Sequence, residues 1–155
     1  MALSTDDDSG NGGPLHLLKM AVGVGSLDEL RQARAARIQQ HGGSWVYTRN
    51  HPRRAEAVLA GGSLFWVIRG QIRVRQGVTG FRSERDEKGR AYCLIEVEPL
   101  LVPTTWRRWR PFQGWRYLTP ADAPPDAPHG YGPPDSSQSP MPERMLAELR
   151  SLGLL

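Results

Sequence analysis

The stretch GGSLFWVIRGQIRVRQ, residues 61–76, is the most apolar and most strand-like run of the 155-residue chain. Alternate side chains of a β-strand share a face. One face then carries Leu64, Trp66, Ile68, Ile72 and Val74. The other face starts with Phe65 and Val67 and continues with Arg69, Gln71, Arg73 and Arg75. A glycine inside a strand often marks a bend. We therefore expect one long strand, or two strand pieces, bent at Gly70 and carrying one core face and one basic face.

Helix and strand signals alternate on both sides of this stretch. Ser26-Leu27-Asp28-Glu29 forms a capping box that predicts a helix over 26–40, and Gly61-Gly62 ends a second helix over 53–60. Alternating or apolar runs predict strands over 15–22, 44–49, 78–84, 90–98 and 112–118. Asp86-Glu87-Lys88-Gly89 predicts a hairpin turn between the strands over 78–84 and 90–98. Prolines at 99, 103 and 111 predict a loop over 99–111. The fold class is therefore α+β, a small mixed β-barrel or strongly bent sheet with two or three helices.

The ends of the chain differ from its middle in composition. Residues 1–14 are rich in Asp and Gly and predict a disordered tail, and residues 15–118 form a single α+β domain. Residues 119–140 are rich in Pro and Gly and predict an extended arm. Residues 141–155 predict a C-terminal helix with an apolar stripe of Met145, Leu146, Leu149 and Leu152. A protein partner or self-association through Pro142 to Leu155 is therefore one expectation.

Charge is concentrated in one part of the chain. The whole sequence has a formal net charge of +4, but residues 69–116 hold 11 basic and 5 acidic residues, which gives +6. Such a segment attracts phosphates or other anions. The single cysteine, Cys93, excludes an internal disulfide and is expected to be a small buried apolar residue in a cytoplasmic protein. No apolar run reaches the roughly 18 to 20 residues of a membrane span, so no membrane partner is expected.

The sequence contains none of the common motifs for catalysis, nucleotide binding or metal binding that we considered. There is no phosphate-binding loop, no GxGxxG fingerprint and no HExxH pattern, and the four histidines are scattered. Ser63 follows a helix and precedes a strand, which is the reverse of the order around a nucleophilic serine in a strand–turn–helix elbow. We therefore expect no catalytic residues, no metal and no cofactor.

Two basic features point instead to nucleic acid. The first is the arginine row at 69, 73 and 75, and the second is WRRWRPFQGWRY at 106–117, because exposed aromatic rings stack on unpaired bases. The candidate binding residues are Arg69, Arg73, Arg75, Trp106, Arg107, Arg108, Trp109 and Arg110. Two alternatives compete with this interpretation. Glu96 and Glu98 could neutralise the row from the neighbouring strand, or the aromatic rings could close the core beneath arginines in internal cation–π pairs.

Three blocks of the sequence carry a resemblance. GGSLFWVIRGQIRVRQ, PFQGWRYLTPADAPPD and MPERMLAELRSLGLL together resemble a family of small bacterial proteins of unknown function. More distantly, the order of short helix, glycine turn and strand ending in arginine over 55–69 is similar to PUA-like folds, including the ASCH and EVE branches. That resemblance implies a small β-barrel associated with RNA. The lysine and glutamate of the ASCH pattern are replaced here by Leu64 and Val67, so the resemblance implies no catalytic role.

The leading functional hypothesis is a non-catalytic protein that binds RNA or single-stranded nucleic acid. The first alternative is a protein-interaction module that uses the C-terminal helix. The second is a small-molecule enzyme, which would require His51, Arg69 and Glu96 to meet in one polar pocket.

Overall fold

The structure is a computed structural model that describes residues 13–131. Its elements are, in chain order, β1 (His16–Met20), α2 (Leu27–His41), β2 (Trp45–Thr48), α3 (Ala55–Leu59), β3 (Ser63–Ile68), β4 (Gln71–Arg85), β5 (Ala91–Val97), β6 (Val102–Arg108) and β7 (Trp115–Leu118). The disordered tail predicted over 1–14 lies outside the described residues except for Gly13 and Pro14, and the C-terminal helix predicted over 141–155 lies wholly outside them.

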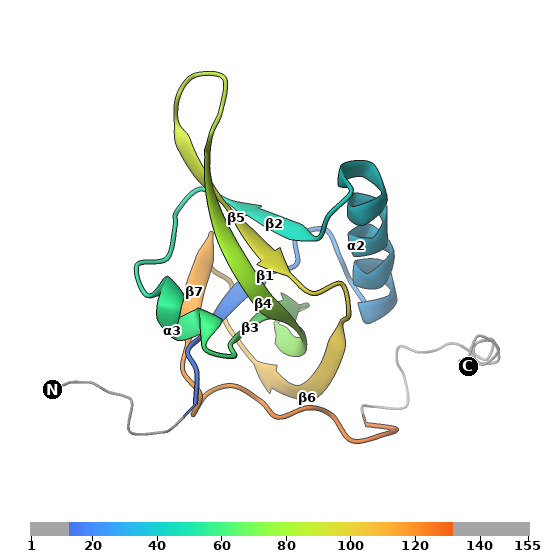
Figure 1. Ribbon diagram of the computed structural model, residues 1–155. Coiled ribbons are helices and arrows are strands. Elements are labelled where there is room, and N and C mark those ends of the chain that lie inside the picture. Colours follow the sequence, from blue (N-terminus) through green and yellow to red (C-terminus); the bar gives the residue numbers. More distant parts are fainter. Residues whose placement is uncertain (1–12, 132–155) are drawn as a thin grey trace, which may run out of the picture.

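Seven strands form one mixed sheet that bends strongly around the core (Figure 1). The strand order is β2-β5-β4-β3-β1-β7, and β6 pairs with β4 beside this path. The first part of β4 therefore lies between β3 and β6, and its second part pairs with β5. The β1–β3 pair is parallel, and the other pairs are antiparallel. The predicted α+β class with a strongly bent sheet is confirmed, but the sheet is open and not a closed barrel.

The central stretch reverses direction where only a bend was expected. β3 and β4 pair antiparallel across a two-residue turn, with Ile68 opposite Gln71. Arg69 and Gly70 in this turn have φ values of 51° and 78°. Positive φ at both central residues is the pattern of a type I′ hairpin turn, whose twist matches that of the strands it joins. The interpretation as two strand pieces holds, but Gly70 helps to fold the second piece back on the first.

A β-bulge at Arg73 explains why the expected two faces are not continuous. Trp66 pairs with Val74 and Val67 pairs with Ile72, so Arg73 is the extra residue on β4. A bulge of this kind breaks the simple alternation of side chains. Val74 packs with Leu64, Trp66 and Ile68 in the larger core cluster, whereas Ile72 packs with Phe65 and Val67 in a smaller one. The predicted shared face for Ile72 and Val74 is therefore wrong, and both faces of β3 are buried.

The predicted loop over 99–111 is also wrong, since β6 occupies its centre. β6 contains Pro103, which has no N–H to donate, yet a proline is tolerated in a strand where the ladder does not need that donor. The carbonyl of Pro103 accepts a hydrogen bond from the N–H of Ala127 at 2.9 Å, and the N–H of Thr105 donates to the carbonyl of Pro125 at 2.9 Å. The described part of the predicted arm thus runs along the outer side of β6.

The longer helix, α2, follows from its caps. Ser26 accepts a hydrogen bond from the N–H of Glu29, and Gly42 ends α2 in the left-handed conformation at φ 74°. Only Leu30 and Arg34 of α2 are buried, so the helix packs by a narrow edge. No helix in the described part of the chain is long and apolar enough to cross a membrane.

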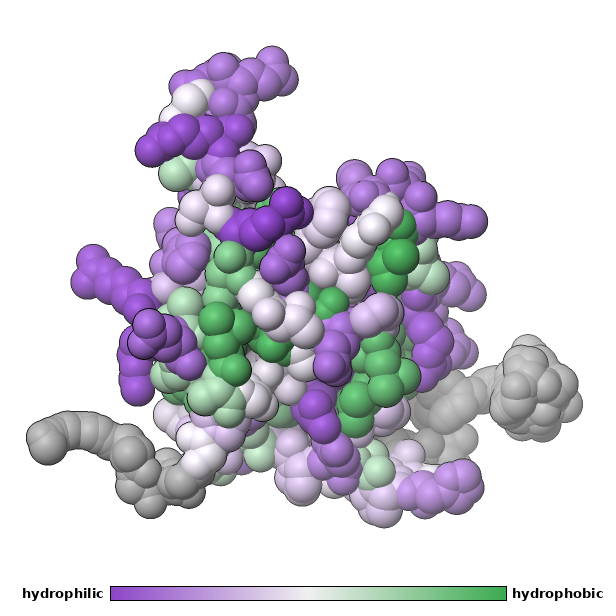
Figure 2. Space-filling model, in the orientation of Figure 1, coloured by the Kyte–Doolittle hydropathy of each residue, from purple (hydrophilic) through white to green (hydrophobic). Residues whose placement is uncertain are grey.

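The second part of β4 and the start of β5 project from the body as a long hairpin (Figure 1). Its far end is strongly hydrophilic (Figure 2). The turn follows the predicted Asp86-Glu87-Lys88-Gly89 pattern, with Gly89 at φ 80° and Asp86 accepting from two backbone N–H groups. Cys93 lies at the base of this hairpin and is fully buried, and burial raises the pKa of its thiol, as expected for an apolar side chain.

Candidate nucleic-acid interface

Two segments that are far apart in sequence meet at one end of the sheet. Gln71 pairs with Arg108, and the N–H of Trp109 donates to the carbonyl of Gly70 at 2.9 Å. The β3–β4 turn and the chain leaving β6 are therefore neighbours. We call the four side chains that this pairing brings to the same end of the sheet the tip cluster: Arg69, Arg108, Trp109 and Arg110.

The tip cluster carries three exposed positive charges. Arg69, Arg108 and Arg110 are all exposed. Among residues 13–131, none of these three guanidinium groups takes part in an ion pair. Trp109 is half-buried, because part of its ring packs on the smaller core cluster. The guanidinium of Arg107 lies 5.7 Å from the centre of that ring. The end of the sheet thus carries exposed cations together with one aromatic side chain that is anchored in the core.

Arg69 adopts an uncommon backbone conformation at the tip. It is the one residue other than glycine with positive φ in the described part of the chain. The left-handed region costs a residue with a Cβ atom roughly 1 to 2 kcal/mol, and such strain clusters at functional sites. Its side chain extends toward the start of α2, where its Nε lies 3.1 Å from the position that a Cβ on Gly25 would occupy. The Glu29 carboxylate already accepts from the Gly25 N–H at 2.7 Å, so that helix end is capped internally.

Trp106 and Arg73 form an internal stack beside the tip. The guanidinium of Arg73 lies 4.0 Å from the centre of the Trp106 ring, the shortest of the six cation–π contacts among the described residues. The next arginine on β6, Arg107, contacts the Trp109 ring and forms an ion pair with Asp122 at 3.4 Å. The alternative of internal cation–π pairs therefore describes Trp106 and Arg73 better than an open stacking surface does.

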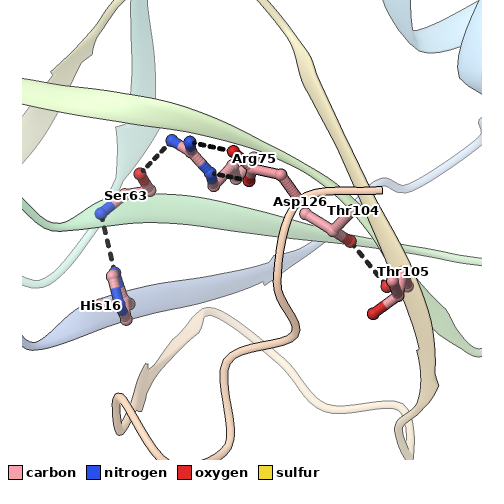
Figure 3. A network of polar contacts seen from close by, with 6 residues as sticks. All are labelled: His16, Ser63, Arg75, Thr104, Thr105 and Asp126. Carbon is pink, nitrogen blue, oxygen red and sulfur yellow. Dashed lines mark hydrogen bonds and ion pairs between the residues drawn. The ribbon is translucent and has the colours of Figure 1, made fainter. Parts of the chain in front are cut away.

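Arg75 is held by a polar network on the side of the sheet that faces the arm (Figure 3). Its Nε and Nη2 donate to the two carboxylate oxygens of Asp126 at 2.8 and 2.9 Å. Its Nη1 donates to the Oγ of the buried Ser63 at 3.0 Å. The side-chain hydrogen bond to Asp126 raises the pKa of Arg75, and the same bond lowers the pKa of Asp126. A bidentate pair of this kind is strong and geometrically specific, so Arg75 ties residue 126 to the sheet.

His16 completes the same network from β1. Its Nδ1 accepts a hydrogen bond from the backbone N–H of Ser63 at 3.0 Å (Figure 3). The His16 ring meets the ring of Phe65 edge-on at 5.0 Å. Burial, with a smaller contribution from the charge on Arg75, lowers the pKa of His16 from 6.5 to about 4. The imidazole is therefore neutral at pH 7. It bonds to the Ser63 backbone and not to its hydroxyl, so the pair is not arranged as a nucleophile and its base.

The question of whether Glu96 and Glu98 neutralise the arginine row has a mixed answer. Glu96 forms an ion pair with Arg82 at 3.1 Å and lies away from the row. Glu98 acts on Arg75 only as a minor charge. The acid that pairs with the row is Asp126, on Arg75, and Asp122 pairs with the neighbouring Arg107. Sequence reasoning missed both acids because they lie in a Pro-rich segment that was expected to be an extended arm. The signal that could have found them is that two acids stand in the segment directly following a strongly basic one.

The residues required by the enzyme hypothesis make separate contacts. The His51 ring lies 5.6 Å from the ring of Phe81, Glu96 pairs with Arg82, and Arg69 sits by Gly25. Phe81 lies ten residues along β4 from Gln71, the first residue after the turn that holds Arg69. Within residues 13–131, no group of three or more His, Cys, Asp or Glu side chains is placed to hold a metal ion.

The fold and the tip together define an α+β protein with an open, strongly bent sheet and a basic cluster at one end of it. A family model described as "Protein of unknown function (DUF1489)" matches residues 17–155, and the chain belongs to this family. The expectation of a family of unknown function is thereby confirmed. No curated protein and no solved structure matches the chain.

Proposed function

We propose that this protein binds RNA or single-stranded DNA without catalysis and that the tip cluster is its main contact. The observation that carries the proposal is that the β3–β4 turn and the chain leaving β6 are neighbours at one end of the sheet, which brings Arg69 to the same end as residues 108–110. The three arginines there have no ion-pair partner in the described part of the chain. Arginine pairs with phosphate oxygens in a bidentate way, and an anchored tryptophan offers a flat face to an unpaired base.

The proposed interface is narrower than the eight residues expected from the sequence. Arg75 is engaged by Asp126 and Ser63, and Arg73 covers Trp106. Both would have to leave existing partners to bind a phosphate. We therefore assign them a supporting role in the sheet, and we place direct contact at the tip cluster with Arg107 beside it.

A PUA-like arrangement remains part of this proposal. α3, the Gly61-Gly62 turn, β3 and Arg69 follow one another in the order that the resemblance implied. Leu64 and Val67, which replace the polar residues of the ASCH pattern, are fully buried in the core. Their burial supports a role in binding over a role in catalysis at this strand.

The test is a titration of labelled single-stranded RNA and DNA of mixed sequence, followed by fluorescence anisotropy at 50 and 200 mM salt. We expect binding that weakens with salt. The triple variant Arg69→Ala, Arg108→Ala, Arg110→Ala should bind at least about ten-fold more weakly at 50 mM salt, and its log–log salt slope should fall by about 2, since each lost phosphate contact on a single strand removes roughly 0.7.

The matched control removes three exposed cations elsewhere, in the variant Arg37→Ala, Arg53→Ala, Lys88→Ala. It has the same net charge as the tip variant. Binding that falls equally in both triples would show attraction to net charge alone and would overturn the assignment to the tip. The absence of salt-sensitive binding by the wild-type protein at 50 mM salt would overturn the proposed function itself.

The protein-interaction hypothesis and the enzyme hypothesis are judged separately. The protein-interaction hypothesis depends on Pro142 to Leu155, which lie outside the described residues. If deletion of these residues leaves the oligomeric state and the captured partners unchanged, that hypothesis fails. The enzyme hypothesis is weakened by the separate contacts of His51, Arg69 and Glu96. A cytoplasmic location remains part of the proposal.

A further inference from the structure

A second group of arginines and aromatic rings lies at the opposite end of β4. Residues that pair across neighbouring strands point to the same face of a sheet. Tyr47 of β2 pairs with Leu94 of β5, and Leu94 pairs with Arg82 of β4. In the next row Trp45 pairs with Glu96, which lies opposite Gly80. These rows, together with Tyr92 two residues before Leu94, share one face of β2, β5 and β4.

This face is the outer one. The residues between these positions, Val46, Cys93 and Ile95, point the other way and belong to the larger core cluster. Leu94 is only 8% exposed, yet it belongs to neither core cluster. It is therefore covered by its neighbours on the outer face.

Two tyrosines form the exposed part of this face. The rings of Tyr47 and Tyr92 lie 5.1 Å apart at an interplanar angle of 38°, and Tyr47 is 47% exposed. Neither phenol hydroxyl has a hydrogen-bond partner within residues 13–131. We call Tyr47 and Tyr92, with the arginines beside them, the tyrosine platform.

The arginines of the platform are neutralised, unlike those of the tip. Arg49 lies 5.8 Å from the centre of the Tyr47 ring, donates to the carbonyl of Ala91 at 2.9 Å and pairs with Asp86 at 3.8 Å. Arg82 lies 5.0 Å from the centre of the Trp45 ring and pairs with Glu96 at 3.1 Å and with Glu84 at 3.6 Å. A surface of flat rings and paired charges suits a flat, uncharged group better than a phosphate.

We propose that the tyrosine platform stacks unpaired nucleobases of the same single strand whose phosphates the tip cluster holds. This inference rests on the proposed function and gives it a second, separate contact. Base–aromatic stacking tolerates any base, because every base has a flat face. The separation of the two sites along β4, from Gln71 to Arg82, is at most about 36 Å at roughly 3.3 Å per residue. The strand must therefore be long enough to reach both.

The experiment compares two variants in the full-length chain. Tyr47→Ala, Tyr92→Ala removes the rings, whereas Tyr47→Phe, Tyr92→Phe keeps them and removes only the hydroxyls. With a 20-nucleotide single strand we expect the alanine variant to bind about ten-fold more weakly at an unchanged salt slope, since a stack is worth roughly 1 to 3 kcal/mol per base. The phenylalanine variant should bind like the wild type.

A cross-linking experiment on the wild-type protein tests the platform even if the variants fail to fold. A 20-nucleotide RNA containing 5-iodouracil should cross-link on irradiation to the peptides that contain Tyr47 or Tyr92. Wild-type binding without such cross-links, or an alanine variant that binds as the wild type does, would overturn the platform and leave the proposed function standing. A wild-type protein that binds no strand overturns both. An alanine variant that only loses self-association, as measured by sedimentation, would assign the platform to a second copy of this chain and overturn the inference.

Discussion

The two ends of β4 are built from the same kinds of residue and differ in how their charges are compensated. At its start lies the tip cluster, with three exposed arginines and the half-buried Trp109. None of these three arginines forms an ion pair with an acid among the described residues. At its far end, Arg49 and Arg82 lie over Tyr47 and Trp45, and each pairs with a carboxylate. The composition of Arg and aromatic residues does not distinguish these ends. The positions of a few acids do.

The sheet around the strand differs between the ends as well. The first part of β4 lies between β3 and β6, and its Ile72 and Val74 are fully buried. The second part pairs with β5 and runs out into the projecting hairpin. Under the proposals above, a buried start and a projecting end have different tasks, with phosphate contacts at the tip and base stacking toward the hairpin. Four predictions separate these tasks.

The largest expected effect comes from reversing charge at one end only. Arg108→Glu, Arg110→Glu should weaken binding of single-stranded nucleic acid about 100-fold at 50 mM salt, because like charges facing each other cost several kcal/mol. Arg85→Glu, Lys88→Glu makes the same charge change on the hairpin and should weaken binding by no more than about three-fold. Anisotropy titrations measure both. Equal losses would remove the distinction between the two ends.

The pair of Arg75 and Asp126 is expected to govern stability and not binding. Asp126→Asn should lower the free energy of unfolding by about 1 to 2 kcal/mol, since it breaks a two-bond contact to a partly buried guanidinium, and the half-exposed carboxylate limits the loss. Asp122→Asn breaks the single, half-exposed contact with Arg107 and should cost less than about 0.5 kcal/mol. Urea titrations followed by tryptophan fluorescence measure both. A larger effect of Asp126→Asn on nucleic-acid affinity than on stability would place Arg75 back in the interface.

His16 predicts a dependence of stability on pH. Its folded pKa, about 4, lies below its ordinary value of 6.5, so the unfolded chain binds the proton more tightly. The stability from the neutral ring is therefore complete above pH 6.5 and is lost as the pH falls from 6.5 to 4. We expect a loss of about 1 to 2 kcal/mol, reduced from the full shift because the ring is partly exposed.

The matched variant for this prediction is His16→Asn, whose Oδ1 can still accept from the Ser63 N–H but does not titrate. Thermal melts between pH 7 and 4 should show a smaller loss for the variant than for the wild type. Asp126, whose pKa is lowered from 3.8, contributes its own loss only below that value. Identical profiles for both proteins would show that His16 is not the titrating group.

The smallest effect is expected from a substitution of Arg69. It should raise the stability of the fold and lower the affinity for nucleic acid. Arg69→Asn places Asn-Gly in the turn, the pair that type I′ hairpins favour, and should raise the free energy of unfolding by about 0.5 to 1 kcal/mol. The same change should weaken nucleic-acid binding by a few-fold. Urea titration and anisotropy on one preparation measure both. A variant that is more stable and binds equally well would remove Arg69 from the tip cluster.

Local patterns predicted much of the fold. The capping box at Ser26, the Gly61-Gly62 stop and the Asp86 turn all appear where their residues indicated, because each depends on a few neighbouring side chains. The hairpin at Arg69 was missed because arginine rarely occupies a position with positive φ, so the turn looked like a bend. β6 was missed because Pro103 suggested a loop, and only pairing with β4 and residues 125–127 makes it a strand.

The candidate site was predictable only in part, for a similar reason. Its residues at Arg69 and 108–110 stand out in the sequence as a basic group. The bulge at Arg73 interrupts the alternation of side chains, so the expected arginine row does not share one continuous face. Sequence periodicity alone does not reveal such a bulge. Asp126 lies 51 positions from Arg75, and no local rule joins them. The tyrosine platform was missed altogether, since Tyr47 and Tyr92 become neighbours only through the pairing of β2 with β5.

The hydrogen bonds between β6 and residues 125–127 have a consequence for solubility. A strand edge with unpaired N–H and C=O groups is a template on which other chains can add, and proteins generally cover such edges. Here the carbonyls of Pro103 and Pro125 and the N–H groups of Thr105 and Ala127 satisfy one another. The Pro-rich segment thereby covers the edge of β6. We expect that cutting the chain before Pro125 would expose this edge and promote aggregation through strand pairing.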